Sequence, residues 1–155
     1  MKKMINFIKL LFKPSVLMID IGLLSLRVLP SYFMFFEHGW GKISNPDRWE
    51  KLGSSLTQYL NISFDSINIF FGFAASFSES ICAIFIFFGF FTKPSTFLLA
   101  FTMFIAGMKH ITGTGSPENA FVYCSIFIAL FFSGPGKYSI DYIFHFKGEI
   151  NDKKY

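Results

Sequence analysis

Apolar residues occur in four long blocks, and this pattern predicts four helices. The blocks run from about Val16 to Phe36, Ile67 to Phe91, Ser95 to Ile111 and Glu118 to Ser133. A bilayer core about 30 Å thick needs roughly 20 helical residues to cross it. The first two blocks reach this length, whereas the last two must borrow flanking residues or thin the bilayer locally. We therefore expect an all-α fold, a four-helix transmembrane bundle, because open structures of other kinds leave backbone groups unpaired in lipid.

The composition supports a membrane protein. Of 155 residues, 52% are hydrophobic, 24 are phenylalanine and only 15% are charged, against roughly 25% charged in ordinary soluble domains. These values exclude a disordered chain, a disulfide-stapled secreted domain and a typical cytosolic enzyme. The net charge of +4 is compatible with nucleic-acid binding, but the basic residues cluster at segment ends, as in membrane proteins. The expected partner is thus the lipid bilayer, and no nucleic acid.

The basic residues also predict the orientation, since cytoplasmic flanks of membrane helices are enriched in lysine and arginine. With the N-terminus inside, nine flank the inner helix ends: Lys2, Lys3, Lys9, Lys13, Lys93, Lys137, Lys147, Lys153 and Lys154. Four flank the outer ends: Lys42, Arg48, Lys51 and Lys109. We expect both termini in the cytoplasm, with a basic N-terminus (1–15), a membrane domain (16–141) and a tail (142–155). A tight Thr92-Lys93-Pro94 link would make the second and third helices antiparallel neighbours.

The long connection between the first two helices, from about Gly39 to Ser66, then lies outside. Asn45-Pro46-Asp47 is typical of a helix start, with asparagine as the cap and proline in the first turn. Four apolar residues follow at helical spacing: Trp49, Leu52, Leu56 and Leu60. This spacing predicts an amphipathic outer helix. Two interpretations remain open, a surface anchor and a lid over a pocket.

Ionisable residues inside the helices need partners, because each costs about 2.5–3.5 kcal/mol on insertion scales. One helical face is predicted to contain Asp20, Arg27, Ser31, Met34 and His38. In the second helix Glu79 lies among small residues, which permit close helix packing in lipid: Gly72, Ala75, Ser76, Ser80 and Ala83. We expect Glu79 to point into the bundle and to pair with Arg27 near mid-membrane. The pair could fix helix register or serve a proton or ligand site.

A second polar group is expected at the outer ends of three helices. Its members are Glu37, His38, Lys42, Lys109, His110 and Glu118. Histidines and carboxylates that converge can bind a metal or shuttle protons, but no compact ligand spacing supports a metal, and residues at helix ends can simply face water. Cys82 and Cys124 are placed at different depths, so no disulfide is expected. The chain has no nucleotide, haem-attachment or CxxC motif.

The order of these motifs resembles the DoxX family of small membrane proteins. The similarity runs from an arginine in the first helix through His38-Gly39-Trp40-Gly41-Lys42 and Glu79 to Gly89-Phe90-Phe91-Thr92, His110 and Glu118. It ends in Gly134-Pro135-Gly136-Lys137-Tyr138-Ser139-Ile140-Asp141, where Gly134 and Pro135 also end a helix. The resemblance covers roughly residues 16–141. It implies a four-helix protein of the bacterial inner membrane and a component of a membrane oxidoreductase, related to a subunit of archaeal thiosulfate:quinone oxidoreductase.

The resulting hypothesis is a respiratory or stress-linked redox component that binds a quinone or another small molecule near the outer half of the bundle. The candidate catalytic residues are His38, Lys42, Glu79, His110 and Glu118, and the ligand-binding or interior polar network is Arg27, Glu79 and Trp40. The cofactor is not determined, a redox partner subunit is expected, and a homo-oligomer is compatible with the sequence. The alternatives are a small-solute or metal-ion carrier and an assembly or scaffolding subunit without catalysis.

Overall fold

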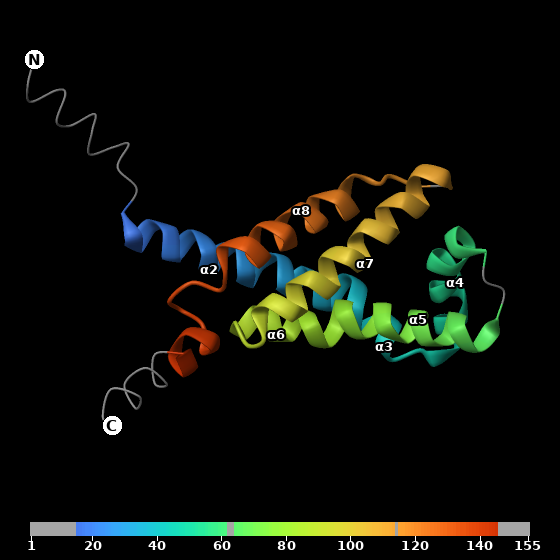
Figure 1. Ribbon diagram of the computed structural model, residues 1–155, viewed down its shortest axis with the longest axis horizontal. Coiled ribbons are helices and arrows are strands. Elements are labelled where there is room, and N and C mark those ends of the chain that lie inside the picture. Colours follow the sequence, from blue (N-terminus) through green and yellow to red (C-terminus); the bar gives the residue numbers. More distant parts are fainter. Residues whose placement is uncertain (1–14, 62–63, 114, 146–155) are drawn as a thin grey trace, which may run out of the picture.

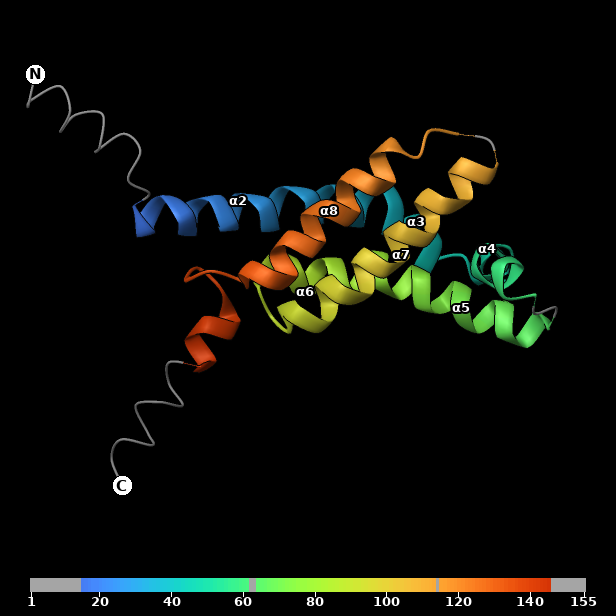
Figure 2. The same ribbon diagram turned by 45° about the horizontal axis from the view of Figure 1, so that its top comes forward.

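The structure, a computed structural model, describes residues 15–61, 64–113 and 115–145, and this part of the chain is helical with no strand. Most of the N-terminal and C-terminal regions named above lie outside the described residues. The principal helices are α2 (Val16–Phe33), α3 (Trp40–Ile43), α4 (Trp49–Leu60), α5 (Asp65–Phe77), α6 (Ala83–Phe88), α7 (Thr92–Thr112) and α8 (Glu118–Ser133). In Figures 1 and 2, α4 lies at the opposite end of the molecule from the start of α2. We call these the α4 end and, after the orientation that the sequence predicts, the inner end.

The first long helix extends further than its apolar pattern predicts. A π-helical turn, Met34–Gly39, joins α2 to α3 without a break, so one continuous helix runs over Val16–Ile43. The long connection therefore begins near Ser44 and not at Gly39. The π turn has a wider repeat than an α-helix, and it rotates the residues that follow it relative to those before it.

The outer connection folds as an amphipathic helix, as the spacing of its leucines predicts. A 3₁₀ turn, Pro46–Arg48, leads directly into α4. Asn45 stands at the start but does not cap it, because its side-chain amide donates to Gly41 O at 2.8 Å. α4 packs directly on α5 at Gly53 and Gly72, where any side chain would overlap the backbone of the other helix.

The second long helix consists of α5, a π-helical turn (Ser78–Cys82) and α6. It ends at Phe88, and Gly89, Phe90 and Phe91 form the turn to α7. Gly89 has φ +68° and Phe91 φ +46°, so the chain reverses through two left-handed residues. The predicted link of Thr92, Lys93 and Pro94 is wrong, because these residues form the first turn of α7.

The helices enclose a small apolar core and expose many large apolar side chains on the outside. The core is formed by Met34, Ala83, Ile86, Leu99, Ala100, Met103, Cys124, Phe127 and Leu130. Exposed residues include Met18, Phe70, Phe97 and Phe132, the last with 79% of its surface accessible. Such a surface suits lipid and not water. Within the described residues, three helices are long and apolar enough to cross a membrane, and α8 is a shorter apolar helix of 16 residues.

Arg27 does not pair with Glu79, which corrects the predicted ion pair. Its guanidinium donates to Pro135 O at 2.6 Å and to Tyr138 O, and it lies against Gly89 at the inner end. The error arises because α2 projects beyond α6 and α7 at this end (Figures 1 and 2), so counting residues from the start of α2 misplaces Arg27 in depth. Arg27 therefore anchors the segment that follows α8.

That C-terminal segment has a structural role at the inner end. α8 ends at Ser133, and Gly134 follows with φ +79°, as expected for a glycine stop. The Ser139 hydroxyl accepts the backbone N–H of Tyr142 at 3.1 Å and so caps the start of the helical residues 140–145. Asp141 instead accepts the backbone N–H groups of Phe91 and Thr92, each at 2.9 Å, and thereby caps the start of α7.

Candidate functional site

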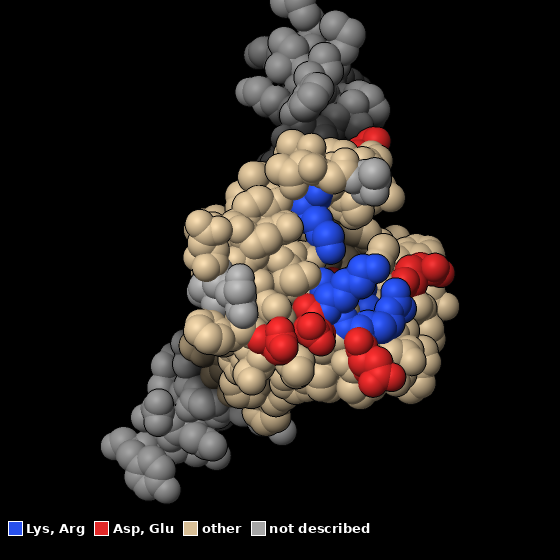
Figure 3. Space-filling view, turned by 90° about the vertical axis from the view of Figure 1, so that its right-hand side faces the viewer, with Lys and Arg blue, Asp and Glu red and all other residues tan. Residues whose placement is uncertain are grey.

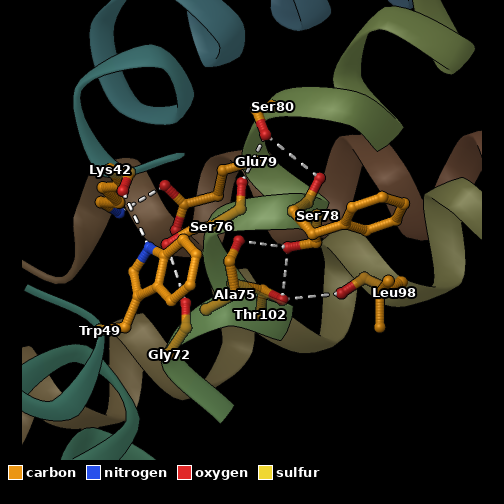
Figure 4. Close-up of polar contacts among 11 residues, drawn as sticks. Lys42, Trp49, Gly72, Ala75, Ser76, Ser78, Glu79, Ser80, Leu98 and Thr102 are labelled. Carbon is orange, nitrogen blue, oxygen red and sulfur yellow. Dashed lines mark hydrogen bonds and ion pairs between the residues drawn. The ribbon is translucent and has the colours of Figure 1, made fainter. Parts of the chain in front are cut away.

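Glu79 is a deeply buried charged residue between the helices, and its partner is Lys42. Only 2% of the surface of Glu79 is accessible. The Lys42 ammonium donates a hydrogen bond to Glu79 Oε2. The carbonyl of Lys42 accepts the indole N–H of Trp49 at 3.0 Å. Figure 4 shows Lys42 and Glu79 directed toward each other, with Trp49 beside them. The ion pair thus joins the first long helix to the second.

Close backbone packing makes this pairing possible. A β-carbon on Gly39 would overlap the carbonyl of Glu79, so only glycine permits the approach. Gly39 ends one π turn, and Glu79 lies within the other. The two irregular turns therefore pack against each other beside the ion pair.

Hydroxyl groups near Glu79 are satisfied by neighbouring backbone carbonyls. The Ser76 hydroxyl donates to Gly72 O at 2.8 Å and the Ser80 hydroxyl to Ser76 O at 2.6 Å. Ser78 and Thr102 bond to each other through their hydroxyls at 2.7 Å, which ties this helix to α7 (Figure 4). The predicted face of small residues is confirmed as an interior one: Gly72, Ser76, Ser80 and Ala83 are buried, and Ala75 is half-buried.

A cavity of about 440 Å³ adjoins the ion pair. Most of its walls come from α4, α5 and α7. The residues that border it are Lys42, Leu52, Gly53, Ser55, Leu56, Phe70, Phe71, Ala74, Ala75, Glu79, Leu98, Phe101, Thr102, Ile105, Ala106, Lys109 and His110. Most of these side chains are apolar or aromatic, and the few charged groups are Lys42, Glu79 and Lys109. We call this space the α4 cavity.

Helix α4 forms one wall of the cavity and is bonded to α7. The Lys109 ammonium donates to Ser55 Oγ at 2.6 Å, and the hydroxyls of Tyr59 and Thr112 are 2.9 Å apart. These contacts favour the interpretation of α4 as a lid over a pocket. α4 packs more extensively on α5 than on α7, so its contact with α7 is the smaller of the two.

Basic side chains gather at the α4 end of the molecule. Figure 3 shows lysine and arginine near the middle of this end, with aspartate and glutamate on either side. Lys42 and Lys51 are the charged groups that act electrostatically on Lys109. A local group of basic side chains therefore lies at the α4 end, with acidic side chains around it.

The predicted outer group is only partly brought together. Lys42, Lys109 and His110 border the α4 cavity with Glu79. His38 is exposed and its ring lies 6.0 Å from that of Tyr123. The π turn explains this difference, because its extra residue puts Gly39 on the buried face in place of His38. The other predicted members of that face are confirmed as buried: Asp20, Arg27, Ser31 and Met34.

Three further predicted residues do not border the cavity. Trp40 is 60% exposed, with its ring 5.9 Å from that of Phe35. Glu118 is exposed at the start of α8, and Glu37 is exposed within the π turn.

In the described part of the chain, no group of three or more histidine, cysteine, aspartate or glutamate residues is placed so that it could hold a metal ion. Cys82 and Cys124 are both free and buried.

Two polar residues that border the cavity, Ser55 and Thr102, are not among the predicted site residues, although the sequence contains a signal for each. Thr102 precedes Lys109 by seven residues, which places both on one face of α7. Ser55 follows Leu52 by three residues and precedes Leu56, so it shares the face that contains these leucines. Both patterns indicate polar side chains that lie on the buried, apolar face of their helix.

Apolar helices of spanning length, an interior ion pair and a lipid-compatible exterior define an integral membrane protein with several helices. The chain matches the DoxX family over residues 22–111, which is more than half of its length. It therefore belongs to the DoxX family. The matched region contains Arg27, the Lys42–Glu79 pair and all the residues bordering the α4 cavity. No curated protein and no solved structure matches the chain.

Proposed function

We propose that this protein binds a quinone or a comparable small amphipathic molecule in the α4 cavity, as a component of a membrane redox system. DoxX proteins are membrane proteins often linked to oxidoreductase-associated roles. The observation that carries the proposal is the α4 cavity itself. It combines apolar walls with a few convergent polar groups, which is the usual composition of a small-molecule site.

The cavity residues fit a quinone ring in both shape and chemistry. Phe70, Phe71 and Phe101 supply aromatic surface, against which a planar ring can pack in offset or edge-on geometry. Lys109 and His110 lie on the same cavity wall and can donate hydrogen bonds to ring carbonyl oxygens. A bound quinone would supply the electron-accepting chemistry. An imidazole can accept or donate a proton, so His110 is our candidate for proton exchange with the ligand.

The Lys42–Glu79 pair is proposed to keep the polar wall of the cavity in place. Glu79 is buried, and its carboxylate faces Lys42 where it borders the cavity. A carboxylate held by an ammonium retains a fixed position and charge. Lys42, Glu79 and His110 are therefore the predicted catalytic residues that this site can use directly, whereas Arg27 belongs to the inner end.

Two further proposals concern the setting of the site. We propose a bacterial inner membrane with the inner end in the cytoplasm, because basic residues flank that end and the described chain begins and ends there (Figure 1). The α4 cavity would then lie in the outer half of the bundle. Since the sequence contains no motif for an electron carrier, we also propose a redox partner subunit.

Quinone content of the purified protein tests the proposal. Lipids extracted from wild-type protein are expected to contain quinone near one per chain, and Glu79→Gln and His110→Ala should contain several-fold less. His145→Ala is the matched control, because His145 is exposed at the inner end, and it should retain the wild-type amount. The proposal would be contradicted if the wild-type protein contained no quinone, or if His145→Ala lost as much quinone as Glu79→Gln and His110→Ala.

A further inference from the structure

Lys109 is distinguished from the other charged residues of the α4 cavity by its neutral partner. Its ammonium donates to the hydroxyl of Ser55 at 2.6 Å, and among the described residues it has no salt bridge. The charged groups that act on it are two further cations, Lys51 and Lys42. Lys109 therefore lies beside the cavity without a counterion from the part of the chain that the structure describes.

The charges that border the cavity do not cancel. Lys42 and Glu79 neutralise each other in their ion pair, which leaves the ammonium of Lys109 as the excess charge. An ammonium beside apolar walls is stabilised weakly by a neutral hydroxyl and more strongly by an anion. The cavity is therefore complementary to a ligand with one negative charge.

The apolar walls define the rest of that ligand. Phe70, Phe71 and Phe101 border the cavity together with aliphatic residues. A volume of about 440 Å³ falls within the range of small-molecule pockets, which is roughly 300–1,000 Å³. One or two fused rings with a single polar substituent would contact both the aromatic residues and Lys109.

We propose that the α4 cavity selects an aromatic monoanion, whose anionic oxygen binds the Lys109 ammonium in place of the Ser55 hydroxyl. This inference rests on the proposed function in that it assigns a charge to the ligand of the same cavity. Two sources share this chemistry, a quinone with an ionised ring hydroxyl and an aromatic carboxylate. The basic side chains in the middle of the α4 end (Figure 3) would favour such an anion locally over a neutral molecule.

Two matched pairs of probes separate charge from shape. The carboxylate pair is 2-naphthoate and 2-naphthamide, and the quinone pair is 2-hydroxy-1,4-naphthoquinone and its neutral 2-methoxy ether. Binding is measured at pH 7.5 on full-length protein in lipid nanodiscs by calorimetry. In at least one pair the anion should bind about tenfold or more tightly than its neutral match, because a charge-assisted hydrogen bond adds about 1.5–3 kcal/mol.

Variants of Lys109 assign that preference to its charge. Lys109→Gln should bind the two members of each pair equally, whereas Lys109→Arg keeps the positive charge and should keep the preference. Lys93→Gln is the matched control, because Lys93 is exposed at the other end of the same helix, and its preference should equal that of the wild type. Preference in the quinone pair alone, or in the carboxylate pair alone, identifies the source.

The outcomes that overturn this inference differ from those that overturn the proposed function. Equal affinity for the anionic and neutral members of both pairs, or a preference that persists in Lys109→Gln, would refute anion selection. If both quinones bound equally and 2-naphthoate bound no more tightly than 2-naphthamide, quinone binding would stand and anion selection would fail. If naphthoate bound with the predicted preference while neither quinone bound, the proposed function would fail and anion selection would stand.

Discussion

At the residue scale, the central feature is a buried carboxylate whose partner comes from another helix. Glu79 retains 2% exposure and Lys42 25%, so the pair lies at the boundary between the interior and the cavity. Removing one member of a buried pair leaves an uncompensated charge, which costs far more than the intact pair contributes. The pair therefore specifies how the two long helices fit together more than it adds net stability.

Substitution of either member should destabilise the protein in a coupled way. Lys42→Met is expected to lower the free energy of unfolding by about 2–3 kcal/mol, below the range for fully buried pairs because Lys42 is partly exposed. The double variant Lys42→Met/Glu79→Gln should lose less free energy of unfolding than the two single variants lose together. The free energies are measured by unfolding in mixed detergent micelles, with Lys93→Met as the control. Additive losses would contradict the pairing.

At the element scale, the site depends on two π-helical turns that pack against each other. Met34–Gly39 and Ser78–Cys82 interrupt the two long helices beside the ion pair. Gly39 permits their contact, since a side chain there would overlap the Glu79 carbonyl. In contrast, Gly41 has open space where a side chain would stand. These two glycines, two residues apart, form a natural comparison.

Alanine substitutions at the two glycines should have opposite effects. Gly39→Ala should lower the midpoint of thermal unfolding by several degrees, because the helices must separate or bend to admit the methyl group. Gly41→Ala should leave it unchanged or raise it slightly, since alanine favours a helix by about 1 kcal/mol over glycine. Thermal unfolding followed by circular dichroism compares them. Equal midpoints for the two variants would show that the close approach at Gly39 is not required.

The sequence predicted the helices and the buried face around Glu79, but it did not predict which charges meet. Apolar blocks and the spacing of small residues are local signals, and they located α5, α7 and the interior position of Glu79. The partner of Glu79 depends on the axial offset between helices and on the π turns, both of which arise from tertiary packing. For the same reason His38 was assigned to the wrong helix face, and Arg27 to the wrong depth.

At the scale of the whole molecule, the two ends have different roles. The inner end is closed by the segment after α8, which Arg27 and Asp20 hold through Pro135 O and the backbone N–H of Lys137. The α4 end contains the cavity, the helix α4 that borders it and a group of basic side chains. This division predicts that ligands enter from the α4 end and that the inner end gives the bundle its rigidity.

The orientation of these ends can be measured by cysteine labelling. In a chain with Cys82 and Cys124 replaced by alanine, a cysteine at Ser44 should react with an impermeant maleimide added outside intact cells. A cysteine added at the C-terminus should react only after the membrane is opened, because both chain ends are expected in the cytoplasm. The cysteine-free chain is the control. Labelling of position 44 from the cytoplasmic side alone would refute the orientation.

The most direct test of the account is to find where a quinone binds. A photoreactive azidoquinone is added to protein in nanodiscs, illuminated, and the labelled peptides are identified by mass spectrometry. The account predicts labelling of α4, α5 and α7 at residues bordering the α4 cavity, such as Leu56, Phe71 and Phe101, and its suppression by excess unlabelled quinone. Labelling confined to the groove between α2 and α8, at Leu29, Phe33 and Val122, would contradict it.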